Sequence, residues 1–382
     1  MNAAFLLTLL VFLISLSTFL GLRYGMRKLK LLADIPPVLN CAAPRVSIIF
    51  SALNEAGTIE PALRSVLALD YPNLEIIAIN DRSTDSTGEI LDRLSREHPA
   101  LRVLHIKELP TGWLGKNHAL QRGGELASGD YLLFTDADVM FNRTALLRAV
   151  AYCEREQLDH LVVLAEFIVR EHLLAMLLLS GSAFMYAKYK PWKVRTSQNH
   201  FFGMGAFNMV RATCYRQAGG HAPLALEVVD DIRLGKLMKH KGYSQDVLLG
   251  FGTVSVEWYR NTREMMRGVE KNSFAMLDYQ FWTLILVTAV LLPVRYWPWI
   301  GLFVTQSVTW WMNLATLAIG LAMFDDLLRP TGWSRRCLAY WPLIGVISML
   351  TIWRGVILTL WRGGIEWRGT RYALAELKRH HH

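Results

Sequence analysis

Asp136 and Asp138 are separated by one residue and closely follow the apolar run 131–134. Alternate residues of an extended chain point the same way, so the two carboxylates are expected to share a face at the carboxyl end of a strand. Their hard oxygen atoms suit Mg²⁺ or Mn²⁺, which takes its other ligands from water and from a substrate's phosphates. The pair therefore indicates a metal-assisted site for a sugar nucleotide, with a solvated turn or a helix cap as the alternative interpretation.

Strand-like and helix-like segments alternate from about residue 45 to residue 160, which predicts an α/β domain with a mostly parallel sheet flanked by helices. The expected strands are 46–50, 74–79, 103–106 and 131–134, and the expected helices are 58–69, 86–96, 116–126 and 142–154. Ligands of such sheets bind outside the carboxyl ends of the strands, where the polar loops 51–55, 80–85 and 135–138 would emerge. Three acidic loops at one edge favour a binding site over isolated turns.

The amino-terminal end of the chain is predicted to cross a membrane. Residues 3–22 are uncharged and apolar, and four basic residues follow between positions 23 and 30. Basic residues on this side of a span place the following domain in the cytosol, so we expect an integral, multi-pass protein of a bacterial inner membrane. A cleaved signal peptide is the alternative.

Three further apolar runs lie near the other end of the chain, at 281–294, 297–324 and 338–360. The first is short and contains Pro293, so either two or three of them cross the membrane. The side of the carboxyl-terminal tail stays open, although its basic residues favour the cytosol. The apolar segment 172–187 precedes several basic residues and suits either a helix in the membrane interface or a buried core helix. The expected parts are 1–30, a membrane helix with its basic flank; 45–275, a cytosolic domain; 276–362, transmembrane or interfacial helices; and 363–382, a basic tail.

The composition agrees with a membrane protein, because 52% of the 382 residues are apolar and the mean hydropathy is +0.23. The net charge of +9 fits anionic lipid headgroups and a diphosphate. Nucleic acid fits less well, because the basic residues cluster beside the apolar segments. The four cysteines, Cys41, Cys153, Cys214 and Cys337, form no C-x-x-C pair and are expected to be buried or free thiols in a reducing compartment.

Four acidic motifs and one loop carry a resemblance to a known family. They are Asn-Glu at 54–55, Asn-Asp-Arg-Ser-Thr-Asp at 80–85, Asp-Ala-Asp at 136–138, Val-Asp-Asp at 229–231, and the loop 109–117, which is similar to a P-x-G-W-x-G-K loop. With these motifs, residues 45–275 resemble the family 2 inverting glycosyltransferases. Within that family they resemble the membrane-bound enzymes that glycosylate lipids, such as ceramide glucosyltransferase and the hopanoid-associated and carotenoid glycosyltransferases. The resemblance implies a nucleotide-sugar-binding fold of the glycosyltransferase A type.

The resemblance implies a site for a UDP-sugar. Asn54, Glu55 and Asp81 would hold the uracil and the ribose, with helix capping and turn formation as the alternative. Lys116 would lie near the diphosphate, at the start of a helix whose free amides also favour anions. A surface lysine is the alternative interpretation of Lys116.

The same resemblance implies a metal site and a base. Asp138 would be the principal ligand of Mg²⁺ or Mn²⁺ and Asp136 would assist, so that the cation neutralises charge on the departing UDP. Inversion by direct displacement also needs a base within reach of the acceptor hydroxyl. Asp231, beside Asp230, is the candidate, because adjacent desolvated carboxylates raise each other's pKa. Ordinary first-turn helix residues are the alternative.

Arg260 and Arg263 match the family's Q/R-x-x-R pattern, and Arg263 would clamp the diphosphate unless it is a membrane-surface arginine. Glu264 stands where many members have tryptophan. This difference argues against processive synthesis and suits an acceptor that is not a sugar chain. Residues 366–372 resemble the W-R/K-G-R-x-Y tail of the lipid-modifying subgroup, with Thr370 displacing the usual arginine by one place. The role of this tail stays open.

The predicted activity is the transfer of a single sugar from a UDP-sugar to the hydroxyl of a membrane lipid at the cytosolic leaflet. The acceptor would be a sphingolipid, a hopanoid or another isoprenoid lipid. The expected partners are this donor, this acceptor and the bilayer, without nucleic acid, and the oligomeric state stays open. A processive polysaccharide synthase and a non-catalytic membrane scaffold that binds a sugar nucleotide are the alternatives.

Overall fold

The computed structural model describes residues 2–39 and 42–379. The chain forms two compact units. The sheet unit comprises Leu29–Ile168, Pro191–Trp258 and Arg368–His382, and the helical unit comprises Met1–Lys28, Val169–Lys190 and Tyr259–Trp367. Cys153, Cys214 and Cys337 are buried free thiols, as predicted, and Cys41 lies outside the described residues.

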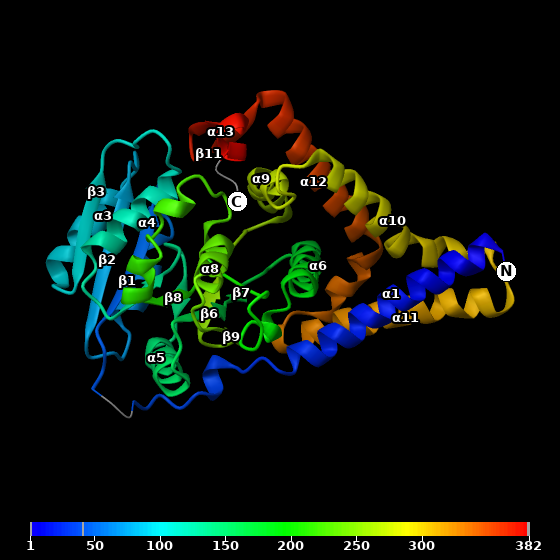
Figure 1. Ribbon diagram of the computed structural model, residues 1–382, viewed down its shortest axis with the longest axis horizontal. Helices are drawn as coiled ribbons and strands as arrows, with labels where there is room; N and C mark the ends of the chain where they lie inside the picture. Colours follow the sequence, from blue (N-terminus) through cyan, green and yellow to red (C-terminus); the bar gives the residue numbers. More distant parts are fainter. Residues whose placement is uncertain (1, 40–41, 380–382) are drawn as a thin grey trace. The chain divides into compact units, whose positions relative to one another are not determined.

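A seven-stranded, mostly parallel sheet forms the centre of the sheet unit (Figure 1). Its strand order is β3-β2-β1-β4-β8-β6-β9, and only β8 runs antiparallel to its neighbours β4 and β6. The bounds are β1 Val46–Ala52, β2 Leu74–Asp81, β3 Leu101–Ile106, β4 Tyr131–Phe134, β6 His160–Leu164, β8 Asn208–Arg211 and β9 Gln245–Leu249. A second sheet joins β5 (Met140–Phe141), β10 (Val254–Val256) and β7 (Glu166–Phe167). The α/β fold predicted from the sequence is confirmed.

Helices cover both faces of the large sheet. The bounds are α2 Ile59–Leu67, α3 Thr87–Glu97, α4 Gly115–Leu126, α5 Ala145–Glu156, α7 Ala212–Gln217 and α8 Asp230–His240. Successive residues of β1 serve opposite faces: Ile48 packs in a core with α2, α3 and α5, whereas Ile49 packs in a core with α4, α7 and α8. Every residue of β1 is buried, as expected for a strand covered on both sides. The sheet unit also contains η1 Leu32–Asp34, η2 Pro191–Lys193, η3 Ala222–Leu224, β12 Thr370–Ala373 and α13 Leu374–Arg379.

The helical unit is built from long apolar helices. The bounds are α1 Ala3–Met26, α6 His172–Tyr189, α9 Thr262–Ala275, α10 Phe281–Val304, α11 Ser307–Leu328, η4 Arg329–Thr331, η5 Arg335–Tyr340, α12 Trp341–Arg362 and β11 Gly364–Trp367. Four helical segments are long and apolar enough to cross a membrane, namely Ala3–Met26, Phe281–Val304, Ser307–Thr331 and Arg335–Arg362. The helix α6 covers the segment 172–187, which was expected to be helical.

The breaks between the carboxyl-terminal helices differ from those expected. The sequence suggested a break at Arg295, but α10 continues through Arg295 and contains Pro293 and Pro298. Arg295 Nη2 donates to Ser180 Oγ at 3.0 Å, so α6 provides a polar partner for this charge and the helix does not need to end there. The break falls instead at Thr305 and Gln306, between α10 and α11.

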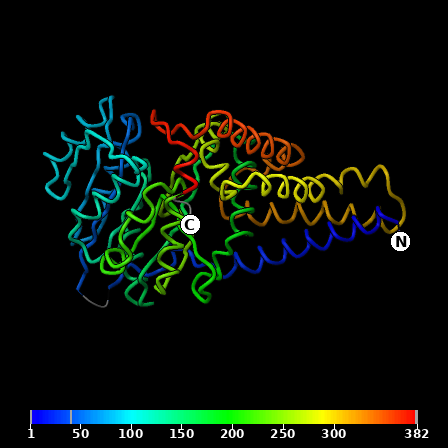
Figure 2. The backbone as a smooth tube through the Cα atoms, turned by 45° about the horizontal axis from the view of Figure 1, so that its top comes forward, coloured from blue at the N-terminus to red at the C-terminus, as the bar shows by residue number. Residues whose placement is uncertain are grey.

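A group of three helices and a pair of helices make up most of the helical unit. The helices α1, α10 and α11 lie side by side (Figure 2). Arg23 near the end of α1 pairs with Asp326 near the end of α11, and Asn313 Nδ2 lies 3.5 Å from Thr8 Oγ1 nearer their beginnings, so α1 and α11 run parallel. The helix α12 packs along α9, where Arg354 pairs with Glu270.

Two buried histidines make the sheet unit sensitive to acid. Burial lowers the pKa of His160 to about 4, and burial with the charge of Lys116 lowers the pKa of His221 to about 3. An unfolded histidine has a pKa of about 6.5, so below this pH the unfolded chain binds protons that the folded one refuses. Stability is therefore fully present above about pH 6.5 and falls as the pH approaches the folded-state values, by up to about 1.4 kcal/mol per pH unit for each histidine.

We expect the midpoint temperature of thermal unfolding of the sheet unit to decrease as the pH is lowered from 6.5 to 4.5. His221→Gln should make this decrease per pH unit smaller. The measurement is a melting curve followed at a series of pH values. The exposed His240 offers a matched control, since His240→Gln should leave the slope unchanged. Equal slopes for wild-type protein and His221→Gln would contradict the prediction.

Candidate functional site

The loops that follow β1 and β2 form one structure at the carboxyl edge of the sheet. Asn54 Oδ1 accepts hydrogen bonds from the Thr84 backbone N–H at 2.8 Å and from the Thr84 hydroxyl at 3.3 Å. The Glu55 backbone N–H donates to Thr87 Oγ1 at 2.9 Å. The buried Asp81 is held by its neighbour Arg82, at 2.8 Å and 3.0 Å. The structure therefore brings Asn54, Glu55 and Asp81 together, as the sequence predicted for loops at one edge.

The strand β4 ends at Phe134, so Asp136 and Asp138 follow it as a loop, and Asp138 lies in a turn. Their side chains are both partly exposed, with the buried Ala137 between them. Burial, then the charges of Asp136 and Glu55, raise the pKa of Asp138 to about 7. Three carboxylates from two loops thus act on one another at this edge.

Lys116 connects the aspartate turn to the start of α8. It is the second residue of α4, and its Nζ lies 2.9 Å from Asp136 Oδ1 and 3.4 Å from Asp230 Oδ2. Its side chain is only 15% exposed. Burial alone would lower the pKa of Lys116, but the carboxylates of Asp136, Asp230 and Asp231 raise it, so the ammonium group stays charged.

Asp230 and Asp231 occupy the first turn of α8. Asp231 Oδ2 accepts from the Gly205 backbone N–H at 2.9 Å, and its Oδ1 accepts from the Ile232 backbone N–H at 2.8 Å. Burial and the adjacent Asp230 raise the pKa of Asp231. A carboxylate with a raised pKa and fixed orientation can accept a proton near neutral pH.

The carboxyl-terminal tail lies at the same edge, which the sequence did not indicate. Arg368 Nη2 lies 3.1 Å from Glu55 Oε1, and its charge acts to lower the pKa of Asp138. Thr370 Oγ1 accepts from Arg82 at 3.4 Å, and the Tyr372 hydroxyl accepts from the Gly115 backbone N–H at 3.3 Å. The contact with Gly115 falls at the amino-terminal end of α4. The tail therefore reaches the loops after β1 and β2 and the start of α4.

Arg260 and Arg263 belong to the helical unit, and both are exposed. Their expected role at a diphosphate stays a prediction. Asn261 Oδ1 accepts from the Glu264 backbone N–H at 2.9 Å, and Glu264 Oε2 accepts from the Arg260 backbone N–H at 3.0 Å. This capping arrangement gives Glu264 a structural role at the start of α9.

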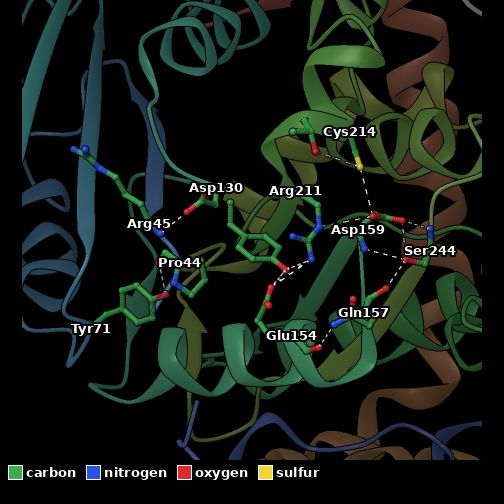
Figure 3. A network of polar contacts seen from close by, with 12 residues as sticks. Pro44, Arg45, Tyr71, Asp130, Glu154, Gln157, Asp159, Arg211, Cys214 and Ser244 are labelled. Atoms are coloured by element: carbon green, nitrogen blue, oxygen red, sulfur yellow. Dashed lines mark hydrogen bonds and ion pairs between the residues drawn. The ribbon is translucent and has the colours of Figure 1, made fainter. Parts of the chain in front are cut away.

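The amino-terminal edge of the sheet has a different character (Figure 3). There the Arg211 guanidinium donates to the Tyr131 hydroxyl at 2.6 Å and lies 3.4 Å from Glu154. Asp159 accepts from the backbone N–H and the hydroxyl of Ser244, at 2.9 Å and 2.8 Å. These contacts tie strand ends together, and such pairing of charges suits a structural role.

The carboxylates at the carboxyl edge fit a divalent cation. Repulsion by Asp136 and Glu55 contributes to the raised pKa of Asp138, and a bound cation would remove the effect of that repulsion. Within residues 2–39 and 42–379, no three His, Cys, Asp or Glu side chains are grouped so as to hold a metal ion on their own. A magnesium-type ion needs only one or two protein carboxylates when phosphates and water supply the rest. The residues fit a cation that is shared with a diphosphate.

Residues 47–212 match the family described as Glycosyl transferase family 2. The chain is 36% identical over 116 residues to the beta-monoglucosyldiacylglycerol synthase of Nostoc sp., covering 30% of this chain and 24% of that protein. It is 37% identical over 101 residues to the poly-beta-1,6-N-acetyl-D-glucosamine synthase of Staphylococcus epidermidis, covering 26% of this chain and 23% of that protein. The matched region spans about a quarter of the length of these curated relatives.

A solved structure has a similar fold. It is a mannosyltransferase from Pyrobaculum calidifontis in complex with GDP-Man and Mn²⁺, with a TM-score of 0.54 and 17% identity. The similarity covers 94% of this chain and 99% of that chain. It supports the glycosyltransferase A type of fold.

Proposed function

We propose that this chain, whose residues 47–212 match the family Glycosyl transferase family 2, moves one sugar from a UDP-sugar to the hydroxyl of a membrane lipid, with inversion. The observation that carries the proposal is the charge arrangement at the carboxyl edge of the sheet. Lys116 pairs with Asp136, which together with Glu55 acts on Asp138, and it also pairs with Asp230, which adjoins Asp231. One group of acids suits the donor, and the other suits the acceptor.

The donor side would hold a nucleoside diphosphate. Asn54, Glu55 and Asp81 are the proposed contacts of the uracil and ribose, and Lys116 is the proposed partner of the diphosphate, with Arg263 and Arg260 as further contacts. Mg²⁺ or Mn²⁺, held by Asp138 with help from Asp136, would neutralise the charge that develops on the leaving diphosphate. A solved structure of the same fold binds GDP-Man and Mn²⁺, which supports a sugar nucleotide and a divalent ion at the level of the fold.

The acceptor side would deprotonate the lipid. Asp231 takes the proton of the acceptor hydroxyl as the oxygen forms its bond to the anomeric carbon, and the bond from that carbon to the diphosphate oxygen breaks on the opposite face. Asp230 stays beside Asp231, where its charge helps to keep the pKa of Asp231 raised. The proton passes to Asp231, and the bonding electrons leave with the nucleotide.

The lipid acceptor is supported by a relative and by the candidate spans. The Nostoc relative is named for the synthesis of a glucosylated diacylglycerol. Four helical segments in the described part of the chain could cross a membrane by length and composition. A sphingolipid, a hopanoid or another isoprenoid lipid would each present a hydroxyl at the bilayer surface.

The direct test is transfer of radiolabelled sugar by the purified full-length protein. UDP-sugars, with GDP-mannose for comparison, are incubated with Mn²⁺ or Mg²⁺ and each class of lipid, and the extracted lipid is counted. We expect label in one lipid product that carries a single sugar. Absence of label with every donor and acceptor would contradict the proposal.

A polysaccharide synthase is the second candidate, because the Staphylococcus relative carries such a name. It would give products of many lengths rather than one. The capping role of Glu264, where a tryptophan would contact a sugar chain, favours single transfer.

Three crossings are proposed for the membrane part. The helix α1 ends at Met26, three residues before the sheet unit starts at Leu29. The end of α1 is therefore on the same side of the membrane as the chain that enters the sheet unit. Because α11 runs parallel to α1, it also ends on that side, and α10 must cross in the other direction to reach the start of α11. The helix α12 then begins and ends on the side of the sheet unit, since Arg368 follows its end at Arg362 by six residues and belongs to that unit. We therefore place α12 in the interface at the cytosolic face of a bacterial inner membrane, where the Arg354–Glu270 pair is less costly than in lipid.

Single cysteines tested with a membrane-impermeant thiol reagent should report this topology. In a variant with the native cysteines replaced, Gln306→Cys between α10 and α11 should react in intact cells stripped of the outer membrane. Glu376→Cys in the tail should react only after the membrane is opened. Reaction of Glu376→Cys from outside would mean that α12 crosses the membrane.

Arg368 is expected to contribute to nucleotide binding, because it lies at Glu55 and its charge acts on Asp138. Arg368→Gln should weaken the binding of UDP in the presence of Mn²⁺ by about tenfold, the loss of roughly one charge-assisted hydrogen bond. Calorimetry measures this directly. Arg371→Gln removes an exposed charge from the same tail and serves as the matched control. Equal affinities of the two variants would contradict the expected contact.

A further inference from the structure

Three buried polar side chains form a chain across adjacent strands of the sheet. Gln245 on β9 and His160 on β6 are fully buried, and Asn208 on β8 is 2% exposed. Gln245 Nε2 donates to His160 Nδ1 at 2.6 Å, and His160 Nε2 donates to Asn208 Oδ1. Burying a polar group costs free energy unless the group is hydrogen-bonded. Whether these three side chains stabilise the fold therefore depends on the partners of Asn208 and Gln245 at the two ends of the row.

Both ends of this hydrogen-bonded row, Asn208 and Gln245, contact α8 or the loop that lies against it. Asn208 Nδ2 donates to the Asp231 carbonyl oxygen at 3.3 Å. Gln245 Nε2 donates to the Phe202 carbonyl oxygen at 2.9 Å, and Gln245 Oε1 accepts from the Phe202 backbone N–H at 3.2 Å. The same Nε2 lies 3.5 Å from the Gly235 carbonyl oxygen.

The loop 202–205 in turn holds the carboxylate of Asp231. The Gly205 backbone N–H donates to Asp231 Oδ2 at 2.9 Å. A Cβ at Gly203 would overlap the Asp231 carbonyl group, and a Cβ at Gly235 would overlap the Phe202 carbonyl group. The loop and the helix therefore meet backbone to backbone, and a shift of one displaces the other.

We propose that Gln245, His160 and Asn208 are positioning residues, which orient the carboxylate of Asp231 toward the acceptor hydroxyl. The proposal rests on the proposed function of Asp231 as the base. Neutral imidazole has one donor and one acceptor nitrogen, which is what a link between two amide side chains requires. The low pKa of His160 keeps the imidazole neutral in this chain.

A merely structural role predicts a different result from a positioning role. A structural role lowers stability alone, whereas a misplaced base lowers kcat and leaves donor binding intact. Displacing a reacting group by about 1 Å can cost roughly 10²-fold in rate. Asn54, Glu55 and Asp81, the proposed contacts of the nucleoside, lie on the loops after β1 and β2, so the affinity for the nucleotide should not change.

The test compares His160→Leu with His160→Gln. Glutamine retains a donor and an acceptor, whereas leucine fills the space without either. We expect His160→Leu to lower kcat by roughly 10²-fold with a change of less than about twofold in donor KM, and His160→Gln to restore most of the rate. Tyr131→Phe is the matched control, because it removes a buried hydroxyl that bonds Glu154 and Arg211 at the opposite edge of the sheet. Equal kcat for His160→Leu and Tyr131→Phe would overturn the proposal.

A second readout does not depend on activity. Amide hydrogen exchange at 202–205 and at 230–233 should speed up in His160→Leu and stay unchanged in Tyr131→Phe. If His160→Leu does not fold, Asn208→Ala removes the link between His160 and Asp231, leaves Gln245 bonded to Phe202, and should show the same exchange and the same loss of kcat. Unchanged exchange in a folded variant would overturn the positioning role. An inactive wild-type protein with the expected exchange result would instead contradict the proposed function.

Discussion

Asp231→Asn is expected to lower kcat for sugar transfer by roughly 10²- to 10⁴-fold, the usual contribution of a general base. The amide has the shape of the carboxylate and can still accept the hydrogen bond that the Gly205 backbone N–H donates at 2.9 Å. It cannot take the proton of the acceptor hydroxyl. The binding of UDP, measured by calorimetry, should be retained because Asn54, Glu55 and Asp81, the proposed nucleoside contacts, lie on the loops after β1 and β2.

The pH dependence of transfer checks the same assignment. Burial and Asp230 raise the pKa of Asp231, and a base must be unprotonated to act. Transfer by the wild-type protein should therefore fall as the pH decreases through this raised pKa, and the residual activity of Asp231→Asn should lack that acid limb. Full turnover by Asp231→Asn would show that another group is the base.

Asp138→Asn is expected to abolish the dependence of nucleotide binding on Mn²⁺ and to lower transfer by roughly 10²- to 10³-fold, a loss typical of removing one group that stabilises developing charge. Calorimetry with UDP in the presence and absence of Mn²⁺ separates the two effects. Chelation with EDTA should reduce the wild-type protein to the level of the variant.

Asp130→Asn is the matched control for this variant. Asp130 lies at the opposite edge, where its carboxylate accepts from the Arg45 backbone N–H at 2.8 Å (Figure 3). The control should keep its response to Mn²⁺. Activity of the wild-type protein that survives exhaustive chelation would exclude the proposed role of Asp138.

The central sheet could be predicted from the sequence because its strands are short apolar runs with polar loops at their ends. β1, β2 and β4 each stop where Asn54, Asp81 and Asp136 begin the polar loops, and parallel pairing then brings these residues to one edge. Local pattern and long-range pairing therefore agree in this part of the chain.

The contacts that cross between distant segments could not be predicted. Lys116 was expected beside a diphosphate, but its ion pairs depend on how the start of α4 lies against the loop after β4, which carries Asp136, and against the start of α8, which carries Asp230. The tail residue Arg368 reaches Glu55 from more than 300 positions away, and a single sequence carries no signal for such a pair. The expected strand 131–134 ends where the pairing with β1 stops, and the turn that holds Asp138 follows it.

The backbone contact between the loop 202–205 and α8 has a consequence for how the chain tolerates variation. Gly203 and Gly235 carry no reactive group. A methyl group at either position would nevertheless overlap a carbonyl of the opposing segment. In a library with every substitution at each position, selected for sugar transfer, substitutions at Gly203 and Gly235 should be lost as completely as those at Asp138 and Asp231. Alanine at either glycine should be tolerated no better than tryptophan. Sequence variation in this protein would then be confined to side chains around a backbone contact at which no side chain fits.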